Sequence, residues 1–89
     1  MSQKEIEGLS ARKSIYLDLA AQVRQATQRK RIERLAEICD ITRDYIAENG
    51  SPLSLRKLTQ RVLDTHPYSR STIVPDIKEV LDYAGVAYT

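Results

Sequence analysis

The sequence predicts a mainly α-helical domain of four helices with a minimal two-stranded ribbon. The chain has 89 residues, the size of one small domain. It contains no Trp or Phe, so Leu, Ile, Val and Ala must fill the core, and this composition favours helices. Neither Gly nor Pro occurs between Leu9 and Asn49, and apolar residues recur in this stretch at helical spacing.

The first half of the chain is expected to form two helices, near residues 10–27 and 30–48. The first has apolar residues at steps of four, four and three, namely Ile15, Leu19, Val23 and Ala26. The following stretch is almost entirely polar, and a new apolar seam begins at Ile32, which predicts a break between two helices. A single bent helix is the alternative. Residues 1–9 are expected to be a flexible N-terminus, polar and frayed.

A third helix is predicted over residues 55–64. Gly50 ends the preceding helix because glycine readily adopts a left-handed conformation. Ser54 has the position of an N-cap, and its hydroxyl can accept a hydrogen bond from a free backbone N–H. Leu53 and Leu58 have the spacing of a hydrophobic staple.

The fourth helix contains Pro75, which decides where the helix is expected to start. With Thr72 as the N-cap, Pro75 lies in the first turn, where its missing N–H has no helical partner. With Ser69 as the N-cap, Pro75 removes a helical hydrogen bond at a cost of up to about 3 kcal/mol. We therefore expect a loose or 3₁₀-like start at residues 69–71 and a regular helix from Ile73.

One continuous apolar seam is predicted along this fourth helix, formed by Ile73, Ile77, Val80, Leu81 and Ala84. Gly85 ends the helix. Residues 86–89 predict a short strand, and its expected partner is the segment 51–54, which together give the ribbon.

The charges of the chain alternate in blocks, although the net charge is only +2. Residues 10–34 carry seven basic and two acidic side chains, and residues 51–74 carry four basic and one acidic. Residues 35–50 carry one basic and four acidic side chains, and residues 75–89 carry one and three. A fold that gathers the basic blocks on one face would bind an anionic polymer despite the low net charge.

The stretches "LSLRKLTQRVL" and "SRSTIVPDIKEVLDYAGV" resemble the helix-turn-helix of winged-helix DNA-binding domains. "STIVPDIKEV" is similar to the recognition helix of arginine-repressor-type domains. The resemblance covers residues 31–89. It implies a DNA-binding domain over residues 29–89 and a separate helix over 10–28 for packing or dimerisation. Two features depart from the family: Pro75 stands where its members have a basic residue, and four residues after Gly85 leave the wing truncated or absent.

A recognition helix needs an apolar back and a short polar front that enters the major groove. Arg70 is the candidate for guanine edges, and Ser71 and Thr72 are small enough for a close backbone approach. The free N–H groups at the start of this helix attract phosphate. The full set of candidate DNA-binding residues is Ser69, Arg70, Ser71, Thr72, Lys78, Arg56, Lys57, Arg61 and Tyr68.

These residues predict sequence-specific binding of double-stranded DNA by a homodimer. The role would be that of a transcriptional regulator or an accessory DNA-binding factor of a plasmid, phage or transposable element. The alternative is a helical adaptor that uses the same fold to bind a partner protein. Asp76, Glu79 and Asp82 are expected to face away from the groove as solubility residues, with repulsion of DNA as the alternative. Residues 29–34 are expected to be a solvated helix start, with a DNA contact as the alternative.

Other function classes lack their signatures in this sequence. No Gly-rich phosphate loop, HExxH motif or nucleophile elbow occurs, so we expect no enzyme. Cys39 is the only cysteine and His66 the only histidine, so neither a metal site nor any other cofactor is expected. Cys39 lies on an apolar seam and is expected to pack in the core. The sequence shows no membrane span and no signal peptide, which predicts a cytoplasmic protein.

Overall fold

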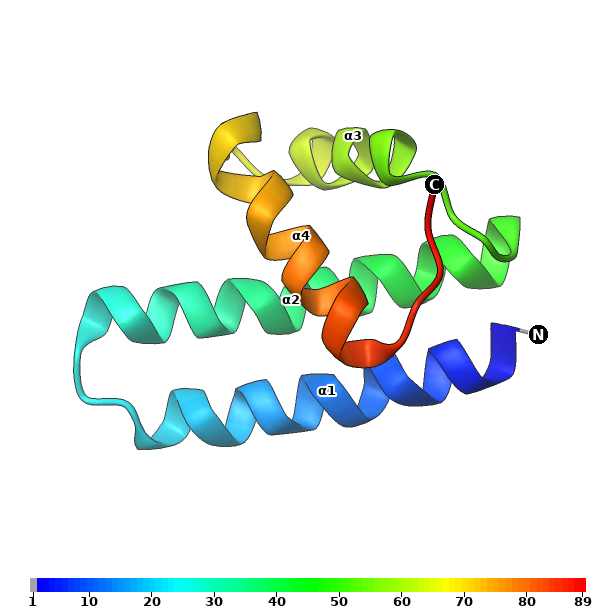
Figure 1. The fold of residues 1–89 in the computed structure, drawn as a ribbon. Helices are drawn as coiled ribbons and strands as arrows, with labels where there is room; N and C mark the ends of the chain where they lie inside the picture. Colours follow the sequence, from blue (N-terminus) through cyan, green and yellow to red (C-terminus); the bar gives the residue numbers. More distant parts are fainter. Residues whose placement is uncertain (1) are drawn as a thin grey trace.

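The computed structural model describes residues 2–89, which form four helices. These are α1 (Ser2–Gln22), α2 (Ala26–Asn49), α3 (Leu55–Thr65) and α4 (Arg70–Ala84). Helices α1 and α2 form a long antiparallel hairpin, α4 crosses it, and α3 lies on the side remote from α1 (Figure 1). The prediction of a mainly helical fold is confirmed. No described helix is both long and apolar enough to cross a membrane.

Helix α1 begins at Ser2, so the prediction of a frayed N-terminus is wrong for residues 2–9. Glu5 and Leu9 are buried, and Leu9 and Tyr16 belong to the hydrophobic core. The first turns of α1 therefore have tertiary partners that fraying would break. The helix expected to serve packing or dimerisation thus packs against the rest of the chain. Met1 lies outside the described residues.

The apolar seam predicted on the first helix is not the one that faces α2. Ile15 and Leu19 are each 42% exposed, whereas Tyr16 and Ala20 are buried. Both pairs have the same step of four residues, displaced by one position. Periodicity alone cannot distinguish these two faces, and the interior selects the one that also contains Leu9.

The break between the first two helices falls at residues 23–25, earlier than predicted. The side chain of Arg29 explains its position. Its guanidinium donates hydrogen bonds to the carbonyl of Val23, from Nε at 3.1 Å and from Nη2 at 2.7 Å. These bonds satisfy a carbonyl at the end of α1 that has no helical partner.

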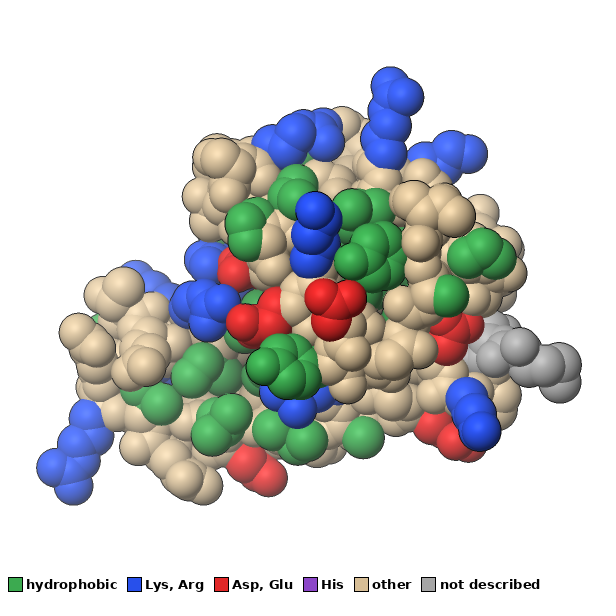
Figure 2. Space-filling view, viewed as in Figure 1, with side chains coloured by type: hydrophobic (Ala, Val, Ile, Leu, Met, Phe, Trp, Pro, Cys, Tyr) green, Lys and Arg blue, Asp and Glu red, His purple; other side chains and the backbone are tan. Residues whose placement is uncertain are grey.

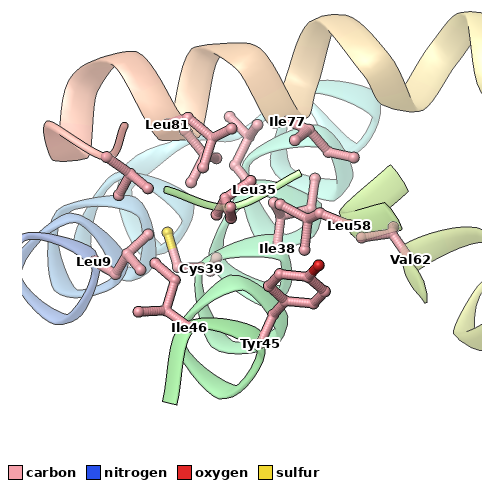
Figure 3. Packing of buried hydrophobic residues seen from close by; sticks show 14 of the residues in the cluster. Leu9, Leu35, Ile38, Cys39, Tyr45, Ile46, Leu58, Val62, Ile77 and Leu81 are labelled. Atoms are coloured by element: carbon pink, nitrogen blue, oxygen red, sulfur yellow. The ribbon is translucent and has the colours of Figure 1, made fainter. Parts of the chain in front are cut away.

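The core lies where all four helices meet, and its side chains point toward one another from each helix (Figure 3). The predicted seam of α4 is confirmed, because Ile73, Ile77, Val80 and Leu81 are fully buried. Gly85 follows α4 in the left-handed conformation expected of it. Cys39 is 1% exposed and packs in the core as predicted.

The predicted two-stranded ribbon is reduced to an isolated parallel bridge between Leu53 and Tyr88, and the described residues form no strand. Three backbone hydrogen bonds hold the segments together. The N–H of Leu53 donates to Ala87 at 3.2 Å, that of Thr89 to Leu53 at 2.9 Å, and that of Leu55 to Thr89 at 3.1 Å. The pairing does not extend further because the segment that contains Leu53 enters helix α3 at Leu55.

The last residues are also held by the start of α1. The carboxylate of Glu5 accepts a hydrogen bond from the backbone N–H of Ala87 at 2.7 Å. Gly8 lies directly against the backbone of Ala84, so close that a Cβ atom at residue 8 would overlap the carbonyl oxygen. Helices α1 and α4 therefore cross at a position that accepts only glycine without movement.

Asp76 is buried, so its predicted role as a solubility residue is wrong. Its side chain is 5% exposed and lies 2.7 Å from the guanidinium of Arg34 and 3.4 Å from that of Arg31. Arg31 also pairs with Glu79 at 3.3 Å. These arginines belong to the stretch expected to be solvated or to contact DNA, but they join α2 to α4 instead.

We predict that Gly8→Ala destabilises the fold. The added methyl group must push the α4 backbone away, which we expect to lower the free energy of unfolding by at least about 1 kcal/mol despite the better helix propensity of alanine. Urea unfolding followed by circular dichroism measures this change. Ser14→Ala, at an exposed position of the same helix, is the control and should be neutral or slightly stabilising. Equal stability of Gly8→Ala and wild type would contradict the close crossing.

A second prediction concerns the buried carboxylate. Asp76→Asn should lower the free energy of unfolding by about 3 kcal/mol, because it leaves the buried side of Arg34 without its anion. Asp44→Asn is the matched control, since the Asp44 side chain is 64% exposed. It should change stability by less than about 0.5 kcal/mol in the same urea titration. A similar small effect of both substitutions would show that the pair with Arg34 is not important for stability.

Candidate nucleic-acid interface

The interface is built on α3 and α4, which are joined by residues 66–69. Ser54 is the N-cap of α3 as predicted, and its Oγ accepts from the backbone N–H of Lys57 at 3.3 Å. Leu53 and Leu58 are both buried, in agreement with the expected staple. Helix α3 is thus fixed from its first turn, with Leu58 and Val62 facing the core.

Helix α4 begins at Arg70 rather than at Ile73, with Ser69 as its N-cap residue. The carbonyl of Ser69 accepts from the N–H of both Thr72 and Ile73, each at 3.1 Å. The bond from Thr72 is of 3₁₀ type, so the expected 3₁₀-like character is present within the helix rather than before it. The Ser69 hydroxyl is 2.8 Å from that of Thr72 and 3.2 Å from that of Ser71.

Pro75 therefore lies inside α4, and the arrangement with Thr72 as N-cap is wrong. A proline there has no N–H to donate to the carbonyl of Ser71, one turn earlier. Both residues are exposed, so water can satisfy this carbonyl. The outer face of the helix thus presents a backbone acceptor in addition to the hydroxyls of its first turn.

The first turn of α4 is exposed to solvent, whereas the opposite side of the helix is buried in the core. Arg70, Ser71 and Thr72 are exposed, and Ile73 and Ile77 are fully buried. This is the arrangement of polar front and apolar back that groove insertion requires.

A basic hollow lies between the start of α3 and the start of α4. Its volume is about 520 Å³, and its lining residues are Ser54, Arg56, Lys57, Gln60 and Arg70. Three of these carry a positive charge and none is acidic, which suits a phosphate group. Lys and Arg side chains gather over α3 along the top edge of the molecule, whereas Asp and Glu side chains lie over the middle and lower part of α4 (Figure 2).

Gln60 orients one of these cations and was not among the predicted site residues. Its Oε1 accepts from Nη2 of Arg70 at 3.0 Å, and its Nε2 donates to Asp64 at 2.9 Å. The sequence places Gln60 one turn after Arg56 and Lys57, on the outward face of α3. That spacing is the signal that could have identified it.

The structure does not bring Arg61 and Tyr68 to this hollow. Arg61 pairs with Glu48 at 2.8 Å and lies over the ring of Tyr45. Tyr68 packs against Arg34, whose guanidinium lies 5.2 Å from the ring centroid. Both side chains turn toward α2, because α2 offers them an acid and a cation that the sequence pattern does not reveal.

Lys78 is exposed on the outer face of α4, two turns beyond the opening residues. The same face carries Ser71, Pro75 and Asp82, at steps of four, three and four. Lys78 is therefore presented outward but lies next to a carboxylate one turn later. The electrostatic attraction for a polyanion is therefore strongest at the first two turns of α4 and decreases toward the end of this helix.

The remaining candidate residues do not form a second site. Nε2 of His66 lies 2.8 Å from Glu37, and its ring stacks on Tyr68 at a centroid distance of 5.7 Å. Within residues 2–89, no group of three or more His, Cys, Asp or Glu side chains is placed to hold a metal ion. Burial raises the pKa of the Cys39 thiol to about 12, which keeps it protonated and unreactive at neutral pH.

This burial predicts slow modification of Cys39. At about pH 8, alkylation by iodoacetamide should be at least about 100-fold slower in the folded protein than in guanidinium chloride, because thiolate is the reactive species. Mass spectrometry over a time course measures both rates. A small cysteine-containing peptide, tested in both solvents, corrects for the effect of the denaturant. Comparable rates in the folded and unfolded chain would contradict the closed packing around α2.

Comparisons of this chain with protein-family models, curated proteins and solved structures found no match, so the assignment of the interface depends on its own geometry and charge.

Proposed function

We propose that this protein binds double-stranded DNA sequence-specifically, with the first turns of α4 in the major groove. The observation that carries the proposal is the solvent exposure of Arg70, Ser71 and Thr72 next to a hollow lined by Arg56 and Lys57. The exposed guanidinium of Arg70, which Gln60 holds at the edge of this hollow, is suited to the paired acceptors of a guanine edge.

The proposed contacts divide into two kinds. Arg56 and Lys57 lie where a helix that precedes a recognition helix meets the phosphate backbone, so they would set affinity and orientation. Arg70 and the hydroxyls of Ser71 and Thr72 would read base edges. Lys78 would reach a flanking phosphate, because Asp82 on the same face makes deep insertion of the second half of α4 unfavourable.

The biological role that we propose is that of a transcriptional regulator or an accessory DNA-binding factor of a mobile element. The alternative is a helical adaptor that binds a partner protein, and the exposed Ile15 and Leu19 favour it. The two functions differ in their response to salt. Binding through phosphate contacts weakens steeply as salt rises, whereas binding through an apolar surface does not.

Arg70→Ala and Lys57→Ala should each weaken binding to random duplex DNA by several-fold at low salt. Each lost phosphate contact should also reduce the slope of log affinity against log salt by about 1. Fluorescence anisotropy with a labelled duplex gives both quantities. Lys4→Ala removes the same charge from an exposed position on α1 and should leave binding unchanged. Absence of binding at low salt, or full affinity in both variants, would exclude the DNA-binding function and favour the adaptor.

A sequence selected from a random duplex library then tests base reading. Arg70→Ala should reduce discrimination at one base pair by about 1–3 kcal/mol, while Lys57→Ala should weaken all sequences about equally. Equal loss in the two variants would mean that Arg70 contacts phosphate rather than a base.

A further inference from the structure

One face of α1 is only half covered by the rest of the chain. Gly8, Arg12, Ile15 and Leu19 follow one another at steps of four, three and four, so they lie on the same side of the helix. The end of α4 covers the first half of this face. Gly8 abuts the Ala84 backbone, and the guanidinium of Arg12 lies 4.5 Å from the centroid of the Tyr83 ring.

The second half of the face is apolar and exposed. Ile15 and Leu19 are each 42% exposed, and the neighbouring Tyr83 is 66% exposed. Figure 2 shows this region as a group of hydrophobic side chains below the end of α4. We call Ile15, Leu19 and Tyr83 the α1 patch. Contiguous apolar surface of this kind on a small domain marks a site of protein association.

The two ends of the α1 patch carry opposite charges. Arg24 follows the end of α1 and is exposed, and it makes no ion pair with any residue from 2 to 89. Asp82, beside Tyr83, is also exposed; among residues 2–89 it forms no ion pair, and its carboxylate accepts a hydrogen bond from the hydroxyl of Tyr88 at 3.3 Å. The patch therefore has an unpaired cation at one end and a carboxylate at the other.

We propose that the α1 patch binds a second copy of this chain, with the two α1 helices antiparallel about a two-fold axis at the level of Leu17. Arg12 and Gln22 are equally far from this level along the helix. Tyr83 lies beside Arg12, so the axis brings the end of the second copy's α1 opposite Tyr83. Ile15 then packs against Leu19 of the second copy.

The charges decide in favour of a second copy over an unrelated protein. In this pairing Gln22 lies at the level of Arg12 of the other copy, so Arg24, two residues after the end of α1, comes to the end of the other patch where Tyr83 and Asp82 lie. A two-fold contact repeats the ion pair, so both charged ends of the patch are neutralised at once. The exposed ring of Tyr83 offers the same guanidinium a cation–π contact.

The proposal does not depend on DNA binding. It is compatible with that function. In each chain, α3 lies on the side remote from α1 (Figure 1). The proposed two-fold axis is perpendicular to α1 and lies in the plane between the two α1 helices, so it leaves α3 of both copies on the same side of the dimer. Two basic edges could then face one duplex.

The test is the mass of the whole chain in solution, measured by sedimentation equilibrium from micromolar to millimolar protein. Wild type should approach twice 10.1 kDa as concentration rises. Leu19→Glu should raise the dimer dissociation constant at least about 10-fold, because it places a charge in the centre of the contact. Leu17→Glu is the matched control. Leu17 is 49% exposed on the same helix but points to its other flank, so its substitution should leave the dissociation constant unchanged.

A charge exchange tests the register. Arg24→Glu and Asp82→Arg should each raise the dissociation constant about 3- to 10-fold, and the double variant should restore much of the loss. Circular dichroism confirms that each variant is folded. A wild type that stays monomeric at millimolar concentration would overturn the proposal. So would a dimer that survives Leu19→Glu, one that Leu17→Glu disrupts equally, or a double variant as weak as the sum of the single ones.

Discussion

The contact between Asp76 and the arginines of α2 sets the orientation of α4, and the candidate interface depends on that orientation. The apolar seam of α4 fixes which side of the helix is buried, but apolar contacts alone tolerate some rotation and sliding. A buried carboxylate that must meet Arg34 at 2.7 Å tolerates much less. The apolar seam and this ion pair together fix the face of α4 that presents Arg70, Ser71 and Thr72 to solvent.

How far the sequence could predict this structure depends on how local each signal is. Helix α3 was predicted within one residue, because Ser54 and the staple of Leu53 and Leu58 act within a single turn. The seam of α4 was predicted because the apolar residues from Ile73 to Leu81 share one side of the helix, which leaves only one face to bury. The start of α4 was placed three residues too late, because the cost of Pro75 was given more weight than the tertiary packing that offsets it.

Long-range partners could not be predicted in the same way. Asp76 and Arg34 are separated by 42 positions in the chain, and neither residue alone indicates the pairing. The buried face of α1 was missed because two sets of residues have the same period, and the choice between them depends on Leu9 and Glu5, which lie in a segment expected to be frayed. In the candidate interface, exposure of the first turn of α4 was predicted correctly. The diversion of Arg61 and Tyr68 toward α2 again reflects partners that are distant in the sequence.

Charge is distributed so that different surfaces of this small fold suit different partners. The edge formed by α3 and the first turn of α4 has an excess of cations, while the outer part of α4 mixes Lys78 with Asp82 (Figure 2). The exposed α1 patch is apolar, with Arg24 at one end and Asp82 at the other. A polyanion and an apolar protein surface would therefore be attracted to separate regions, and occupation of one leaves the other accessible.

The bridge between Leu53 and Tyr88 has a practical consequence for work with this protein. Because the carbonyl of Thr89 accepts from the N–H of Leu55, the last residue is held against the first turn of α3, close to Ser54 and the basic hollow. A purification tag or fluorophore fused after Thr89 would emerge there and crowd any ligand of the hollow.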